Sequence, residues 1–146
     1  MIDRDRIQFK LDQLDGYLRE LGAIVPERFE EYLYIEKKRA CERLVQIIVE
    51  AIIDTCTLLV AGLRLGLPGE EDDLFEKLAM RGVITRPMAG TLKRMKGLRN
   101  LLVHEYWRIN DELVFRTIRE RLGDCQGFRR EILVFLRQNL PQGPCS

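Results

Sequence analysis

The chain has 146 residues, which is enough for one domain with a sizeable hydrophobic core and removes the need for disulfide staples. Hydrophobic residues make up 46% of the sequence and charged residues 32%, a composition that excludes an intrinsically disordered protein. With 24 Lys and Arg against 23 Asp and Glu, the net charge of +1 excludes a basic field over the whole surface, so any surface for nucleic acid must be local.

The N-terminal half predicts two helices. Apolar residues at three- and four-residue spacing predict an amphipathic helix over residues 3–21, with Gly22 as a stop. A second helical stretch over 27–65 follows Pro26 and would span on the order of 55 Å as one helix. Because that is long for so small a domain, we expect a bend near residues 54–57 or packing against a second subunit.

The C-terminal half predicts shorter helices, and alternation typical of strands appears nowhere. The expected helices cover residues 72–80, 87–104, 111–122 and 126–139. Helices joined by few residues favour antiparallel neighbours. The sequence therefore predicts an all-α, compact antiparallel bundle of five to six helices, as one domain over 1–140 with a frayed C-terminal tail at 141–146.

Cysteine spacing and hydropathy predict a reducing compartment. The four cysteines are far apart, without a CxxC motif or a histidine nearby, so we expect free thiols and no metal site: Cys41, Cys56, Cys125 and Cys145. The first residues lack an apolar signal region, and charged residues, among them Glu50 and Asp54, break the apolar runs before the 18 or so residues of a spanning helix. We expect a cytoplasmic protein that does not associate with a membrane.

Charges are unevenly distributed around the fourth expected helix. Six cations and one acid, Glu105, lie between residues 86 and 108, just after an acidic cluster at 70–73. The cations are Arg86, Lys93, Arg94, Lys96, Arg99 and Arg108. This pattern indicates either a local basic patch for an anionic partner or a solvated helix face.

The segment from Arg99 to Tyr106 combines the side chains best suited to chemistry. His104 is the only histidine of the chain, and histidine exchanges protons near neutral pH because its unperturbed pKa is about 6.5. Arg99 is a fixed cation that binds two phosphate oxygens at once, and Asn100 adds a polar group beside it. Together these residues indicate work on a phosphodiester.

Cleavage of RNA without a metal needs one group to deprotonate the 2′-hydroxyl and another to protonate the leaving oxygen. One chain has a single histidine, so this mechanism requires a two-fold dimer that brings two copies of His104 and of Arg99 to one cleft. Arg99 and His104 are five residues apart, about 140° around a regular helix, so the helix must loosen near Val103 or end at His104. Asn110 and Asp111 are good caps for the next helix and support a break just after Tyr106.

Structural roles remain open for the same residues. His104 would then cap carbonyls or pair with Glu105, and Arg99 would be solvated or ion-paired. Tyr106 and Trp107 would form a half-buried aromatic pair with polar tips at the rim. Asp54, set among apolar residues, is expected to be a core acid satisfied by a hydroxyl or an arginine, or else a group that orients Arg99 or His104.

The pattern R-x4-H-x-Y, in the form RNLLVHEYW at residues 99–107, resembles the signature of the HepT family of HEPN-domain toxins. The resemblance extends over nearly the whole chain and includes residues 42–46, 50–54, 75–84 and 92–100. It implies a helical bundle that dimerises with the motif residues facing a shared cleft, and a metal-independent endoribonuclease of a type VII-like toxin–antitoxin system.

The resemblance also implies site residues and a partner. Arg99 and His104 would be catalytic, Asn100 would assist them, and no cofactor would be needed. Tyr106 matches the position that a minimal nucleotidyltransferase antitoxin, of the MntA type, modifies with AMP, which would place a bulky anion at the cleft and block RNA. Two alternatives remain: a non-catalytic module that binds nucleotide or RNA or docks a nucleotidyltransferase, and a purely structural helical dimer.

Overall fold

The computed structural model describes residues 2–139, and all the regular secondary structure in that range is helical. In chain order the elements are α1 (Arg4–Ile24), α2 (Phe29–Tyr32), α3 (Ile35–Gly62), α4 (Glu71–Arg81), α5 (Arg86–His104), the 3-10 turn η1 (Tyr106–Arg108) and α6 (Asp111–Asn139). The prediction of an all-α bundle is confirmed. The tail expected at 141–146 lies outside the described residues.

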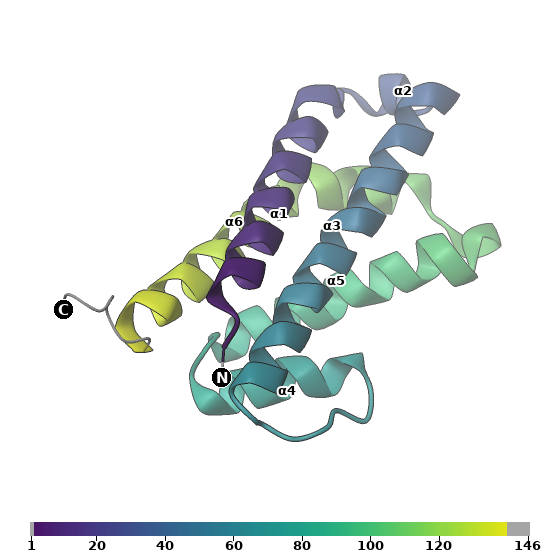
Figure 1. The fold of residues 1–146 in the computed structure, drawn as a ribbon. Coiled ribbons are helices and arrows are strands. Elements are labelled where there is room, and N and C mark those ends of the chain that lie inside the picture. Colours follow the sequence, from purple (N-terminus) through teal and green to yellow (C-terminus); the bar gives the residue numbers. More distant parts are fainter. Residues whose placement is uncertain (1, 140–146) are drawn as a thin grey trace.

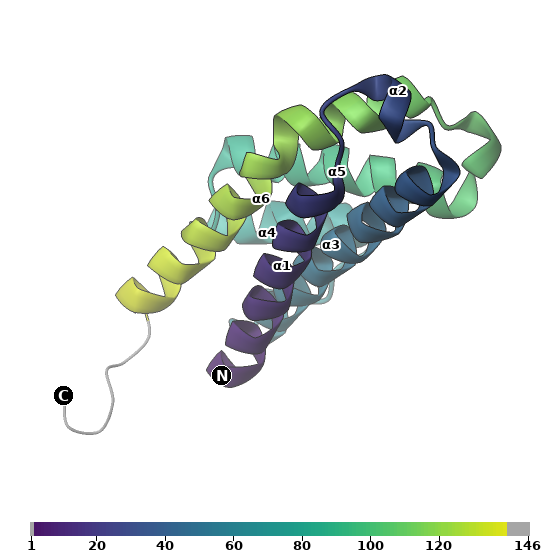
Figure 2. The same ribbon diagram turned by 90° about the horizontal axis from the view of Figure 1, so that it is seen from above.

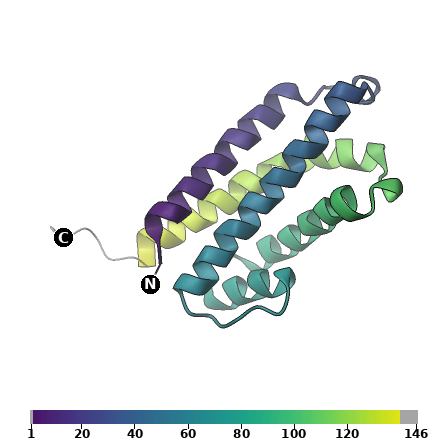
Figure 3. The same cartoon turned by 45° about the vertical axis from the view of Figure 1, so that its right-hand side comes forward.

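Helices α1 and α3 run antiparallel and make the most extensive contact in the molecule (Figure 1). The apolar stripe of α1 expected from its spacing is buried, and the Asp3 carboxylate caps the helix by accepting a hydrogen bond from the Arg6 amide at 3.1 Å. Helix α6 passes behind α1 and α3 in the view of Figure 3 and lies beside α1 in the view from above in Figure 2. Helices α4 and α5 also pack against α3.

The single helix expected over 27–65 is wrong, because the chain leaves the helical conformation at Tyr34 and forms α2 and α3 instead. The cause is tertiary packing of aromatic rings. Tyr32 is fully buried, and its ring lies 5.3 Å from that of Phe115 on α6, while Phe29 lies 5.7 Å from the same ring. These contacts hold the short helix α2 on α6 and turn it away from the axis of α3.

The bend expected near residues 54–57 is also absent, since α3 is helical throughout its 28 residues. The hydroxyls of Thr55 and Thr57 donate hydrogen bonds back to the carbonyls of Ala51 and Ile53, both at 2.9 Å, so they are satisfied within the helix. The length of α3 is covered by several neighbours in succession, because α1, α2, α4 and α5 all contact it.

Asp54 is not a core acid. Its side chain is 54% exposed and forms an ion pair with Lys10 of α1 at 3.2 Å. It lies with Glu50, Thr57 and Ala61 on the outward stripe of α3, at helical spacing, so its apolar neighbours in sequence point the other way. It makes no contact with Arg99 or His104 that would orient them.

The two C-terminal helices expected at 111–122 and 126–139 are one helix, α6. Its buried stripe continues across Gly123 through Ile118, Cys125, Phe128 and Ile132. A glycine inside a helix costs only about 1 kcal/mol relative to alanine, which is less than the burial of these side chains contributes. Continuous packing therefore overrides the expected break.

Three of the four cysteines lie among the described residues, and Cys41, Cys56 and Cys125 are buried free thiols as expected. The expectation that charged residues break the apolar runs before the length of a spanning helix is wrong for α3, which is long and apolar enough to cross a membrane by length and composition alone. Of its most apolar window, 56% is buried inside the bundle.

Candidate functional site

The site is built at the C-terminal end of α5. The helix begins after Thr85, whose hydroxyl accepts a hydrogen bond from the Met88 amide at 3.2 Å, and the bounds agree with the expected 87–104. Glu105 has φ −133° and ψ 47°, so His104 is the last helical residue. The spacing of Arg99 and His104 required the helix either to loosen near Val103 or to end at His104, and the helix does end at His104. This helix end lies before Tyr106, whereas the break was expected just after Tyr106.

Arg99 and Asn100 are brought together, and an acid from α4 joins them. The Arg99 guanidinium pairs with the Glu71 carboxylate at 2.5 Å, and its Nε donates to Asn100 Oδ1 at 3.0 Å. The Arg99 side chain is only 13% exposed. Arg99 is thus a positioned cation with one anionic partner, and a phosphate that binds it must compete with Glu71.

The contact between Arg99 and Glu71 is one of a row of ion pairs between α4 and α5. Lys96 pairs with Asp72 at 2.7 Å, and Glu76 receives both Arg86, at 2.8 Å, and Lys93. The hydrogen bond from Lys93 lowers the pKa of the Glu76 carboxyl below its usual value. The cations counted in the sequence are therefore largely neutralised by α4, and they form neither a free basic patch nor a merely solvated face.

His104 is exposed at the end of the helix. It lies seven residues after Gly97 and three after Leu101, so these three residues share one face of α5, while Arg99 lies on the face toward α4. Within residues 2–139, no hydrogen bond or ion pair joins His104 to Arg99 or to Glu105. The isolated chain therefore presents the two expected catalytic groups in different directions.

Tyr106 is attached to α3 by its hydroxyl. The hydroxyl donates to Glu42 Oε1 at 3.0 Å, the same oxygen accepts from Arg39 at 3.0 Å, and the Arg39 guanidinium lies 4.9 Å from the centre of the Tyr106 ring. Glu42 is only 6% exposed, and burial raises the pKa of its carboxyl. The half-buried aromatic pair expected here is wrong for Trp107, which is 79% exposed.

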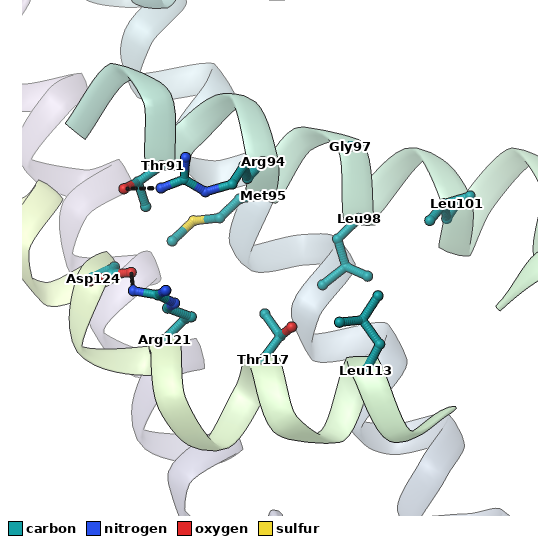
Figure 4. A pocket seen from close by; sticks show the side chains of 10 residues that line it. All are labelled: Thr91, Arg94, Met95, Gly97, Leu98, Leu101, Leu113, Thr117, Arg121 and Asp124. Atoms are coloured by element: carbon teal, nitrogen blue, oxygen red, sulfur yellow. Dashed lines mark hydrogen bonds and ion pairs between the residues drawn. The ribbon is translucent and has the colours of Figure 1, made fainter. Parts of the chain in front are cut away.

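An open apolar groove of about 460 Å³ lies between α5 and α6. Leu98 and Leu113 point toward one another across it, with Met95, Leu101 and Thr117 nearby (Figure 4). Polar pairs, Thr91 with Arg94 and Arg121 with Asp124, lie toward the end away from His104. Because Gly97 and Leu101 line the groove, the face of α5 that holds His104 is also the groove face.

The sequence did not single out Glu71, Glu42 or Arg39. Glu71 belongs to the acidic cluster that precedes the fourth expected helix. Lys93, Lys96 and Arg99 lie on one face of that helix, and pairing this basic face with the acidic cluster would have indicated the ion pairs. Glu42 is an acid on the apolar stripe that continues through Val45 and Val49, which signals a buried carboxylate. Within residues 2–139, no three His, Cys, Asp or Glu side chains gather as metal ligands.

Comparison with known proteins gives consistent matches. Residues 14–132 match the family described as ribonuclease HepT-like. The chain is 30% identical to the tRNA nuclease HepT of Aphanizomenon flos-aquae over 131 residues, which cover 89% of either protein. It is 37% identical to the mRNA nuclease HepT of Shewanella oneidensis over 79 residues, which are 54% of this chain and 59% of that protein.

A solved structure extends the likeness to three dimensions. The tri-AMPylated HEPN toxin of Shewanella oneidensis in complex with MNT antitoxin superposes with a TM-score of 0.84 at 26% identity. The superposition covers 92% of this chain and 99% of the toxin chain. The similarity therefore includes both the sequence and the whole arrangement of helices.

Proposed function

Because the chain belongs to the ribonuclease HepT-like family, we propose that it is a metal-independent endoribonuclease and the toxin of a type VII-like toxin–antitoxin system. The observation that carries the proposal is the end of α5 at His104. It leaves the only imidazole of the chain exposed, with the positioned guanidinium of Arg99 on the preceding turns and Tyr106 just beyond.

The proposed reaction uses two protomers. His104 of one protomer takes the proton of the RNA 2′-hydroxyl, and the partner subunit's His104 gives a proton to the leaving 5′-oxygen, each step contributing about 10²- to 10⁴-fold in rate. Arg99 stabilises the charge that develops on the phosphorus oxygens, and Asn100 holds the guanidinium through its hydrogen bond of 3.0 Å.

The α5–α6 groove supports a homodimer. Its lining is apolar, Leu113 is exposed, and His104 shares the groove face of α5. A second copy packed over this groove would cover the leucines and bring two imidazoles near one another, as the two-histidine mechanism requires.

The match to a tri-AMPylated toxin in complex with MNT antitoxin supports the proposal that a nucleotidyltransferase antitoxin regulates this protein. We assign Tyr106 as the residue that receives AMP, since this residue is 42% exposed and lies two residues after His104. The buried free thiols support a reducing cytoplasm as the place of action.

The test is RNA cleavage by purified protein in EDTA. Wild type is expected to leave a 2′,3′-cyclic phosphate or its hydrolysis product, and His104→Ala is expected to lose at least 100-fold in rate. Val103→Ala, an exposed neighbour on the same turn, is the matched control and should cleave at the wild-type rate. Cleavage by His104→Ala at the wild-type rate would reject the assignment.

The ion pair of Arg99 with Glu71 favours one second candidate, a non-catalytic module that binds nucleotide or RNA or docks the nucleotidyltransferase. A guanidinium that pairs with a carboxylate can stabilise the fold without taking part in phosphate chemistry. Micromolar nucleotide binding without turnover of any RNA would favour this candidate.

A further inference from the structure

Tyr106 ties the turn after His104 to α3, because its hydroxyl donates a hydrogen bond to Glu42 and the Arg39 guanidinium lies 4.9 Å from the centre of its ring. Within the same turn, Arg108 pairs only with its neighbour Glu105, at 2.9 Å, and Trp107 faces solvent. Ile109 packs partly against the core beyond the turn. The conformation in which α5 ends, and from which His104 projects, is therefore fixed by a contact two residues away.

We propose that Glu42 is a positioning residue of the site, acting on His104 through Tyr106, and that AMP transfer to Tyr106 disables the site by breaking this contact. The inference rests on the proposed function for the modification of Tyr106. It adds a second cause of inactivation to the obstruction of the cleft by the added nucleotide.

AMP transfer changes the two properties of Tyr106 on which its hydrogen bond to Glu42 depends, namely the hydroxyl proton and the absence of a negative charge. The Tyr106 oxygen bonds to the α-phosphorus of a nucleoside triphosphate, the bond from that phosphorus to the pyrophosphate oxygen breaks, and pyrophosphate leaves. The hydroxyl proton is lost to the transferase or to water. The product is a phosphodiester oxygen that has no hydrogen to donate and carries a negative charge at the adjacent phosphate.

The surroundings of Glu42 disfavour that product. Glu42 Oε1 already accepts from Arg39, and Oε2 is buried and makes no hydrogen bond to the described residues. The charged and titratable groups that face it are Arg39 and Lys38 on α3, Asp111 on α6, Tyr32 on α2 and Cys41 beside it. Asp111 is paired with Lys38 at 3.1 Å, so a phosphate in this poorly solvated place would be repelled mainly by Glu42, and the half-exposed Arg39, already engaged by Glu42, compensates only in part.

The modified Tyr106 must therefore leave Glu42 and turn toward solvent. Once the hydroxyl is free, the segment keeps its backbone hydrogen bonds and the packing of Ile109, but the end of α5 loses the hydrogen bond that joins it to α3. His104 then samples several orientations, and a proton transfer that needs hydrogen-bond geometry slows down.

The single histidine makes this measurable, because the protein has one imidazole signal in a nuclear magnetic resonance spectrum. We compare wild type, adenylylated wild type, Glu42→Leu and Glu42→Gln, and measure RNA cleavage for the three unmodified proteins. The Gln amide oxygen still accepts from Tyr106, whereas Leu cannot. Glu50→Leu is the matched control, since Glu50 accepts a hydrogen bond from Gln46 on the same helix and does not contact Tyr106.

Glu42→Leu is expected to lower cleavage about tenfold, the factor that corresponds to one lost hydrogen bond, and to shift or broaden the His104 signal. Adenylylated wild type should show the same change of signal, while Glu42→Gln and Glu50→Leu should resemble unmodified wild type. Tyr106→Phe removes the donor instead of the acceptor, so it should reproduce the signal of Glu42→Leu even where that variant folds poorly.

A wild-type signal and rate in Glu42→Leu would overturn the inference, as would an unchanged His104 signal after adenylylation. Failure of the proposed function gives a different result. Wild type would then cleave no RNA or accept no AMP, while the His104 signals of Glu42→Leu and Tyr106→Phe would still report whether the contact positions the imidazole.

Discussion

At the scale of single residues, Arg99 and Glu42 have engaged partners, and these partners determine what each group can do. Arg99 is held by Glu71 and Asn100, and Glu42 is shared between Tyr106 and Arg39. His104 alone has an exposed ring at the end of a helix. The charge available to RNA is therefore set by carboxylates on α3 and α4 as much as by the motif itself.

Glu71→Gln should strengthen the binding of an RNA that cannot be cleaved because it lacks the 2′-hydroxyl. Loss of the competing carboxylate frees Arg99 for one phosphate, so the slope of log Kd against log salt should steepen by about 0.7 and Kd at low salt should fall about threefold or more. Binding titrations at several salt concentrations measure this. Glu20→Gln, the same charge change at an exposed site on α1, controls for net charge.

Glu42→Gln should stabilise the fold as the pH rises. Burial raises the pKa of Glu42 in the folded state above its usual 4.5, so in wild type the unfolded chain ionises first and stability falls between 4.5 and the raised pKa. Gln does not titrate. The difference in Tm in favour of the variant should grow across that range and then stay constant, whereas a difference that shrinks with pH would contradict the assignment.

At the scale of elements, α6 shows how packing prevails over local preference. Gly123→Ala should stabilise the protein by up to about 1 kcal/mol, because a methyl group there meets no atom within 4 Å and the helix gains propensity. Urea unfolding measures the change. Gly127→Ala on the same helix is the comparison, since its methyl group would lie 3.3 Å from the Met88 side chain and the gain should be smaller.

The sequence predicted the helices that have one local apolar stripe, and it failed where the end of a helix depends on packing against a distant segment. The first turns of α1 and α5 follow from apolar spacing and from the caps Asp3 and Thr85, whereas α1 continues through the stop expected at Gly22 and ends at Ile24. The break before α3 depends on Phe115, some 80 residues away, and no local pattern reports it. In the same way the motif indicates a candidate site, but the contacts of Arg99 with Glu71 and of Tyr106 with Glu42 come from other helices and become visible only in the fold.

At the scale of the whole molecule, the single histidine makes pairing a requirement of the proposed mechanism. When wild type is mixed and re-equilibrated with His104→Ala, only dimers with two intact rings should cleave RNA. Activity should then fall as the square of the wild-type fraction, to about a quarter at equal amounts, rather than to about a half. A linear decline would show that each protomer works alone.

A charge placed in the α5–α6 groove should separate the two protomers of the proposed dimer. Leu113→Asp places a charge in the apolar lining and should yield a monomer by light scattering, with cleavage reduced in proportion to the loss of dimer. Thr117→Ser, a mild change in the same lining, should remain dimeric and active. A Leu113→Asp protein that stays dimeric would move the interface elsewhere.

The open groove has a kinetic consequence for a growing cell. Under the proposed two-histidine mechanism two copies must meet before either can act, so the amount of assembled dimer would rise with the square of the number of chains at low abundance. Slow leakage from the gene would leave separate, inert molecules, and damage would begin only after a burst of synthesis crossed a threshold.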